Sequence, residues 1–364
     1  MSTKNLVAKT VLLPCSKLYG AATWLRNKFF DWGILRQVEF DVPVIVVGNL
    51  SAGGTGKTPH VEYIVSALCH RYRIGVLSRG YKRGTKGFIM AGSNHSPRDI
   101  GDEAYQIFRK FNNRISVAVC ENRVEGIRRL LELDPKINLI ILDDAFQHRY
   151  VKPTIAIVIA EYKRPVYTDK LLPYGRLRES ARGLNRADIL IVSKCPQAMR
   201  PLDYRVEIKN YGLYPYQHLY FSRFAYQHLK PVFPDVASTV PYLDWLSESD
   251  SILAVAGIGN PRPFVRHLKS FSAVVKVDIF PDHHFFNRKD IEHITRRYNN
   301  LKGNNRIIVT TEKDAVRLAN NPYFPYELKA STFYLPVEVD FAPTQTEALE
   351  QTIGKLLRQA RTNR

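Results

Sequence analysis

The chain has 364 residues, of which 45% are hydrophobic and 11% aromatic, so it is long enough for two domains and too apolar for a disordered protein. Four scattered cysteines without a Cys-x-x-Cys pair, and no evident secretory signal, argue against a disulfide framework or zinc knuckle and predict a cytoplasmic protein. Lys and Arg outnumber Asp and Glu by 53 to 34, and the formal charge of +19 predicts an anionic membrane surface, nucleic acid or a phosphorylated substrate as partner, unless it serves solubility alone.

The first 36 residues carry an apolar stripe at helical spacing. The residues that recur at steps of three and four are Leu18, Ala22, Leu25, Phe29 and Trp32. The longest uncharged run, 18–25, is much shorter than the roughly 20 residues that cross a bilayer. A basic helix tipped with aromatic residues favours contact with a membrane surface. Packing of the stripe on the protein's own core is the alternative, and periodicity does not exclude it.

A β-branched run at 42–47 leads into a glycine-rich turn and then into a helix-like stretch at 61–69. This order predicts a P-loop, in which backbone N–H groups surround phosphate oxygens at a helix N-terminus. Lys57 would supply a mobile positive charge, and the Thr58 hydroxyl would bind Mg²⁺. A glycine-rich turn that binds no nucleotide is the alternative, but the Gly-Lys-Thr ending favours a nucleoside triphosphate. The predicted loop residues are Ser51, Ala52, Gly53, Gly54, Thr55, Gly56, Lys57 and Thr58.

Short apolar runs then alternate with helical patterns, which is typical of a doubly wound, largely parallel α/β sheet. The predicted strands are 74–78, 116–120, 138–142, 155–159 and 189–192. An aromatic stretch at 211–226 predicts an antiparallel hairpin between two lobes. A nucleobase-stacking platform is the alternative, but it would need its aromatic residues on one face, and here they occupy both. A second α/β lobe begins near Ser251. The expected division is 1–36, an N-terminal helix; 37–210, a P-loop lobe; 211–250, a linker; and 251–364, a C-terminal lobe.

Two acids, Asp143 and Asp144, close the apolar strand at 138–142. Carboxylates at the carboxyl end of a strand beside a P-loop are placed to hold Mg²⁺, directly or through water. Acid pairs also follow strands in other proteins, but the P-loop in the same lobe favours the metal-binding interpretation.

The chain also resembles a known family, the tetraacyldisaccharide 4′-kinases, which phosphorylate the lipid A precursor in Gram-negative bacteria. The resemblance covers nearly the whole chain, and no single generic motif carries it. The motifs, in the expected order, are Val47-Gly-Asn-Leu50, Gly53-Gly-Thr-Gly-Lys-Thr-Pro59, Ser78-Arg-Gly-Tyr81, Gly101-Asp-Glu103, Asp143-Asp-Ala-Phe-Gln-His148, Leu177-Arg-Glu179, Arg186-Ala-Asp188, Gly257-Ile-Gly-Asn-Pro261 and Phe280-Pro-Asp-His283.

This resemblance implies a kinase that uses ATP and Mg²⁺ and has two α/β/α lobes joined by a hairpin. Its substrate would be a tetraacylated glucosamine disaccharide 1-phosphate, phosphorylated on the 4′-hydroxyl. The resemblance also implies a peripheral protein on the cytoplasmic face of the inner membrane. We expect a monomer and no nucleic-acid partner.

The resemblance assigns roles residue by residue. Lys57 would contact the β- and γ-phosphates, Arg123 would stabilise transferred charge, and Asp102 would be the general base with His283 as its partner. The expected Mg²⁺ ligands are Thr58, Asp144 and Glu179, with Asp143 close by. Two alternatives remain open. Asp102 would be a plain helix cap, and His283 or its neighbour His284 would be a surface histidine.

The sequence alone leaves two other classes of function open. A P-loop synthetase that acts on a soluble substrate would not require the basic N-terminal helix. A nucleic-acid-stimulated ATPase would fit the charge of +19, but the sequence contains no recognised nucleic-acid module.

Overall fold

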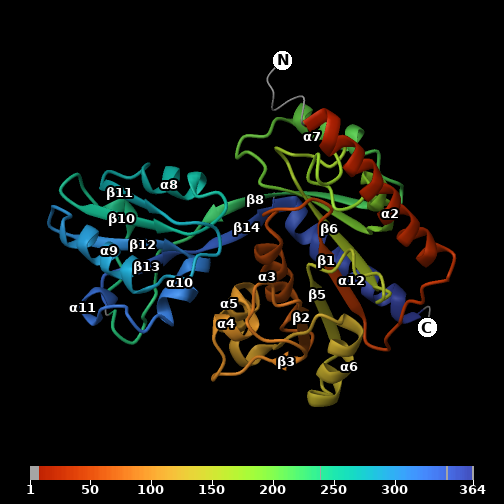
Figure 1. Ribbon diagram of the computed structural model, residues 1–364, viewed down its shortest axis with the longest axis horizontal. Coiled ribbons are helices and arrows are strands. Elements are labelled where there is room, and N and C mark those ends of the chain that lie inside the picture. The colour runs from red at the N-terminus through yellow and green to blue at the C-terminus, as the bar shows by residue number, and fades with distance from the viewer. Residues whose placement is uncertain (1–7, 238, 342, 363–364) are drawn as a thin grey trace.

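The structure is a computed structural model that describes residues 8–237, 239–341 and 343–362. Two α/β lobes lie along the long axis of the molecule, each built on its own sheet (Figure 1). The α/β class expected from the alternating runs is therefore confirmed. The 19-residue helix α2 lies on the outer side of the first lobe (Figure 1).

The first lobe contains a nine-stranded sheet in the order β14-β8-β7-β6-β1-β5-β2-β4-β3, parallel except for the two edge strands β14 and β3. Its inner strands are continuous β-branched runs because both faces of the sheet are buried. The strands are β1 (Val44–Gly48), β2 (Ile74–Ser78), β3 (Ile89–Met90), β4 (Ser116–Val119), β5 (Leu139–Asp143), β6 (Ile155–Glu161), β7 (Ile189–Ser193), β8 (His218–Tyr226) and β14 (Val337–Phe341).

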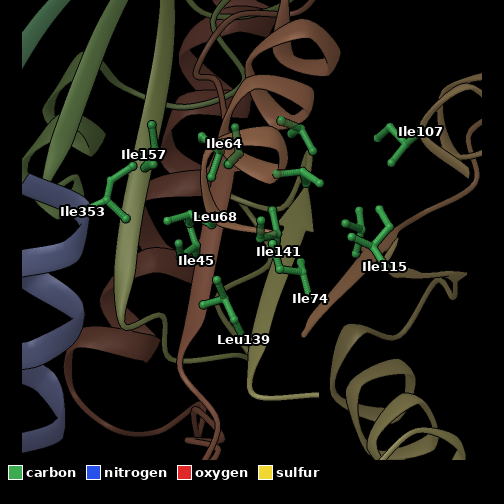
Figure 2. Packing of buried hydrophobic residues seen from close by; sticks show 14 of the residues in the cluster. Ile45, Ile64, Leu68, Ile74, Ile107, Ile115, Leu139, Ile141, Ile157 and Ile353 are labelled. Atoms are coloured by element: carbon green, nitrogen blue, oxygen red, sulfur yellow. The ribbon is translucent and has the colours of Figure 1, made fainter. Parts of the chain in front are cut away.

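Helices cover both faces of this sheet. Side chains of α3, α5 and α12 share a core with Ile45, Ile141 and Ile157 on one face, as Figure 2 shows for Ile64 and Ile353. The other face packs against α6 and α7. The helices of the lobe are α2 (Leu13–Asp31), α3 (Lys57–Leu68), α4 (Pro97–Ile100), α5 (Asp102–Phe111), α6 (Arg123–Leu133), α7 (Pro201–Tyr211) and α12 (Pro343–Thr362), with short turns η1 (Ala8–Leu12), η2 (Asn112–Arg114) and η3 (Ala181–Arg186).

The second lobe contains a five-stranded sheet in the order β11-β10-β12-β13-β9, in which only the short edge strand β9 is antiparallel. Its two faces are packed by separate apolar cores. The strands are β9 (Lys230–Pro231), β10 (Ser251–Ala256), β11 (Val274–Ile279), β12 (Arg306–Thr311) and β13 (Thr332–Leu335), and the helices are α8 (Arg262–Leu268), α9 (Arg288–Asn299), α10 (Glu312–Ala319) and α11 (Tyr326–Lys329), with the short turn η4 (Leu243–Trp245).

The connection between the lobes differs from the hairpin expected within 211–250. An antiparallel pair does join the lobes, but its strands are β8 and β14, with Tyr226 opposite Val337 and Ser222 opposite Phe341. The chain therefore crosses between the lobes twice, and α12 packs on the first sheet. Alternating aromatic residues predict a strand but do not identify its partner, which here lies more than 100 residues away in the sequence.

Helix α2 is attached to the first lobe mainly by polar contacts. Tyr19 donates to the carbonyl of Arg178 (2.7 Å), Arg26 donates to the carbonyl of Gln147 (2.8 Å), and only Phe30 contributes a large buried side chain. The predicted apolar stripe faces outward, since Leu18 is 74% exposed and Trp32 60% exposed. The stripe is therefore not packed on the core. None of the helices in the described ranges has the length and apolarity that crossing a bilayer requires.

Candidate active site between the lobes

The predicted P-loop lies between β1 and α3, at the carboxyl end of the central strand. Gly56 caps α3 with a φ of +92°, and a side chain at this position would collide with the ring of Phe224 on β8. The loop is held from outside by Ser193, whose hydroxyl donates to the carbonyl of Thr55 (2.7 Å). Helix α3 begins directly after this loop, and the N–H groups of a helix N-terminus, which lack intrahelical partners, bind phosphate oxygens favourably.

Asp143 and Asp144 lie next to this loop, because Asp143 ends β5 in register with Val47 of β1. Asp143 is only 1% exposed, and its Oδ1 has no hydrogen-bond partner among the described residues. Burial raises the pKa of Asp143 to about 7, with further contributions from the charges of Glu103 and Asp144. A buried carboxylate oxygen without a partner fits a hard cation such as Mg²⁺, which would provide the missing interaction.

Asp144 is held by two cations at the same edge. It accepts a hydrogen bond from Arg178 (3.0 Å) and lies 3.5 Å from the Lys57 ammonium. Its φ of +48° is unusual for a residue with a side chain and turns its carboxylate toward the P-loop lysine. Asp144 thus holds the Lys57 ammonium group at the carboxyl end of β5.

Glu179 lies in a different set of contacts from the other acids. Its carboxylate accepts hydrogen bonds from Asn27 of α2 (3.0 Å), Gln147 (3.1 Å) and Arg186 (2.8 Å). Within the described ranges, no three or more His, Cys, Asp or Glu side chains are grouped as a metal site. Glu179 links α2 to the loop after β5, and its direct ligation of Mg²⁺ stays a prediction.

Arg123 is the first residue of α6 and is 3% exposed. Its Nη1 donates to the carbonyls of Cys120 (3.3 Å) and Glu121 (3.1 Å), while its Nε has no hydrogen-bond partner within residues 8–237, 239–341 and 343–362. Burial lowers the pKa of Arg123, and the charges of Asp143 and Asp144 oppose that effect. A buried guanidinium with an unused donor beside two acids is suited to bind a phosphate oxygen.

Asp102 and His283 meet across the interface between the lobes. Asp102 begins α5 after Gly101, and its Oδ2 lies 3.1 Å from Nδ1 of His283, which follows β11. The pair predicted from sequence is therefore brought together. Burial opposes ionisation of Asp102, but hydrogen bonds from His283 and Arg317, and their charges, lower its pKa to about 2.

The adjacent histidine has a different environment. His284 lies 2.8 Å from Asp290 through Nε2 and stacks on Phe280 with ring centroids 5.1 Å apart. Asp290 also accepts from the backbone of Asn287 at the start of α9. His284 therefore stabilises a helix terminus, and His283 is the residue that faces Asp102.

The sequence reasoning missed Arg317, which lies on α10 of the second lobe. Its Nη2 donates to Oδ2 of Asp102 at 2.6 Å, and its Nη1 donates to Asp314 at 2.7 Å. In the motif Thr311-Glu-Lys-Asp314, Thr311 ends β12 and caps α10, and Arg317 lies three residues after Asp314 on the same helix face. That spacing was the available signal.

A P-loop and an acid pair on one lobe, with a carboxylate–imidazole pair assembled across the interface, define the class of this protein as a P-loop phosphotransferase. The family described as "LpxK: Tetraacyldisaccharide-1-P 4'-kinase" matches residues 8–358. The chain belongs to the tetraacyldisaccharide 4′-kinase family.

Individual relatives agree with this assignment. The tetraacyldisaccharide 4′-kinase of Bacteroides thetaiotaomicron is 48% identical over 349 residues, covering 94% of this chain and 91% of that protein. The enzyme of the same name from Flavobacterium johnsoniae is 41% identical over 340 residues, covering 93% and 94%. The crystal structure of the "apo" form of LpxK from Aquifex aeolicus in complex with ATP has a TM-score of 0.71 at 29% identity, covering 94% of this chain and 98% of that one.

Proposed function

We propose that this chain transfers the γ-phosphoryl group of ATP to the 4′-hydroxyl of tetraacyldisaccharide 1-phosphate. The observation that carries the proposal is the placement of Asp102 and His283 at the interface that the P-loop lobe forms with the second lobe. A sugar hydroxyl is a poor nucleophile, so a carboxylate that accepts its proton assists the reaction. Membership of the kinase family supports the same reaction.

The reaction exchanges one P–O bond for another. The bond between the γ-phosphorus and the bridging oxygen to the β-phosphate breaks, and a bond from the 4′-oxygen to that phosphorus forms. ADP leaves with the bonding electron pair, and the hydroxyl proton passes to Asp102, whose Oδ1 has no partner in this structure. The protein's other task is to neutralise charge on the transferred group.

Charge neutralisation falls to groups at the edge of the first sheet. Lys57 would leave Asp144 for the β- and γ-phosphates, and Arg123 would donate its unused Nε to the transferred group. When bound, Mg²⁺ neutralises phosphate oxygens and assists departure of ADP. We assign Thr58, Asp143 and Asp144 to hold the Mg²⁺. Glu179 would be a further ligand, although its carboxylate is also bound by Asn27, Gln147 and Arg186.

We further propose that α2 lies on the cytoplasmic surface of the inner membrane as a peripheral contact of a monomer. Its outward face combines Leu18 and Trp24, 74% and 56% exposed, with the exposed cation Lys17. The loop after β6 adds three more exposed cations, Lys163, Arg164 and Lys170, and Leu171 of that loop accepts a hydrogen bond from Ser16 of α2. Apolar and aromatic side chains next to cations match a surface of anionic lipid.

The direct test incubates the purified full-length protein with γ-labelled ATP, Mg²⁺ and tetraacyldisaccharide 1-phosphate in detergent. We expect labelled lipid from the wild type and a loss of kcat on the order of 100-fold or more in Asp102→Asn, with little change in nucleotide affinity. Arg297→Met is a matched control, because Arg297 pairs with Asp278 (3.0 Å) in the second lobe. Absence of lipid product, together with ATP hydrolysis stimulated by nucleic acid, would contradict the proposal.

A further inference from the structure

The two carboxylate oxygens of Asp102 differ in the number of hydrogen bonds that they accept. Its Oδ2 receives hydrogen bonds from Nη2 (2.6 Å) and Nε (3.2 Å) of Arg317 and lies 3.1 Å from Nδ1 of His283. Its Oδ1 is buried and receives none from the part of the chain that the structure describes. The second lobe therefore binds one oxygen, and the other keeps its capacity to accept a hydrogen bond.

Arg317 is held rigidly by its own lobe. Its side chain is 2% exposed, and Nη1 donates to Oδ1 of Asp314 (2.7 Å) and to the carbonyl of Gly257 (3.2 Å). Asp314 accepts hydrogen bonds from the N–H of Gly257 (2.8 Å) and the hydroxyl of Thr311 (2.6 Å). The guanidinium plane is thus fixed by β10, β12 and α10 before it contacts Asp102.

We propose that Arg317 is a positioning residue for the kinase reaction: it fixes Oδ2 of Asp102 from the second lobe and leaves Oδ1 to accept the hydroxyl proton. The inference rests on the proposed function of Asp102 as the base. Two guanidinium N–H groups that converge on Oδ2 fix the position of that oxygen more firmly than a single histidine contact does, because both hydrogen bonds are charge-assisted. Approach of the second lobe would then complete the base as well as cover it.

The same contacts decide when Asp102 is ionised. Burial favours the neutral acid, whereas His283 and Arg317 favour the anion. Without Arg317, burial would act against His283 alone, and the pKa of Asp102 would rise. A protonated Asp102 accepts no proton, so activity would be lost first at low pH. The other charged groups near this carboxylate are Glu103 and its partner Lys313 (2.8 Å apart), Asp282 and Asp314.

A purely structural role for Arg317 predicts a different result. If the arginine only fastened the lobes together, its loss would lower kcat by one factor at every pH and would act independently of Asp102. Positioning predicts a shift of the acidic limb of the pH profile and no additional loss when Asp102 is already absent. These two outcomes separate the explanations.

The experiment measures kcat and kcat/KM from pH 5.5 to 9.5 for the full-length wild type, Arg317→Met, Arg317→Lys, Asp102→Asn and the double variant D102N/R317M, with R297M as control. We expect R317M to lose about tenfold or less at pH 9 and about 100-fold at pH 6, because burial no longer opposed by Arg317 raises the pKa of Asp102 by roughly five units from about 2 and so displaces the acidic limb into the measured range. In R317K most of that displacement should be absent, because lysine keeps the positive charge beside Asp102. D102N/R317M should be no slower than D102N.

A parallel loss at all pH values, or additive losses in the double variant, would overturn the inference. If R317M does not fold, Arg317→Gln carries the test, because it removes the charge but keeps a polar side chain. A loss of kcat that grows toward low pH, with unchanged KM for ATP, supports positioning, and an unchanged kcat overturns it. A wild type without lipid kinase activity at any pH would instead reject the proposed function. NMR chemical shifts of the His283 ring, changed in R317M but not in R297M, provide a readout that needs no turnover.

Discussion

At the scale of single residues, the site contains buried charges that destabilise the fold unless a ligand neutralises them. Asp143 is the clearest case, since it is 1% exposed with one oxygen lacking a partner. Its pKa of about 7 lies above the ordinary value of 3.8, so the folded protein binds a proton more tightly than the unfolded chain between these values. Stability therefore falls as pH rises through that window, and the full cost is present at pH 8.

This cost leads to a prediction about Asp143→Asn. At pH 8 the ligand-free variant should be more stable than the wild type by roughly 1–3 kcal/mol, because no buried charge remains. Kinase activity should fall and the Mg²⁺ concentration for half-maximal activity should rise. Thermal unfolding at pH 8, with and without Mg²⁺, measures the first effect. Asp144→Asn is the matched control, since it breaks ion pairs with Lys57 and Arg178 and should bring no gain in stability.

At the scale of elements, α2 reverses the usual arrangement of a surface helix. Tyr19 and Arg26 face the protein with hydrogen bonds, whereas Leu18, Trp24 and Leu25 face outward and Phe30 is the large apolar side chain of the helix that is buried. The same helix supports the site, because Asn27 donates to Glu179 and Arg149 donates to the carbonyl of Asn27 (2.9 Å). Deleting the helix would therefore disturb the site and membrane contact together, and point substitutions on its outer face separate the two.

We predict that Leu18→Ser combined with Trp24→Ser weakens binding to anionic vesicles several-fold. Both side chains are exposed, so the free energy of unfolding should change by less than about 0.5 kcal/mol. Kinase activity on detergent-dispersed substrate should persist. Phe30→Ala is the contrasting control, since Phe30 is 5% exposed and its loss should cost roughly 3 kcal/mol. Vesicle co-sedimentation and denaturant unfolding give the two measurements, and unchanged co-sedimentation would refute the membrane role.

At the scale of the whole molecule, the P-loop helix is joined directly to the strand that connects the lobes. His60 of α3 is fully buried, with Nδ1 2.7 Å from the carbonyl of Gly56 and Nε2 2.8 Å from the hydroxyl of Ser222 on β8. Burial lowers the pKa of His60 to about 4, which favours the neutral ring with its proton on Nδ1. Movement of β8 between the lobes would thus be transmitted to the cap of the phosphate-binding helix.

His60→Phe tests this link. The variant should lose about 1–2 kcal/mol of stability at pH 7.5 and several-fold in ATP affinity, because Gly56 and Ser222 both lose a partner. Since neutral His60 stabilises the fold fully above pH 6.5, and less as pH falls toward 4, the difference between wild type and variant should shrink across that window. Ser222→Ala, which removes one of the two contacts, should show a smaller effect. Calorimetric ATP binding and unfolding between pH 4.5 and 7.5 provide the data.

Much of this protein can be inferred from sequence because the signals are local. The P-loop, the β-branched strands and the acids after β5 depend on neighbouring residues, and motif order identified the family and paired Asp102 with His283. The partner of β8, the outward face of α2 and the contact of Arg317 with Asp102 depend on residues up to 215 positions apart. Only tertiary packing decides these contacts. A strand's sequence pattern does not specify its partner strand, and helical periodicity does not say which face is covered. The ionisation of Asp102 depends on the side chains that the second lobe places beside it.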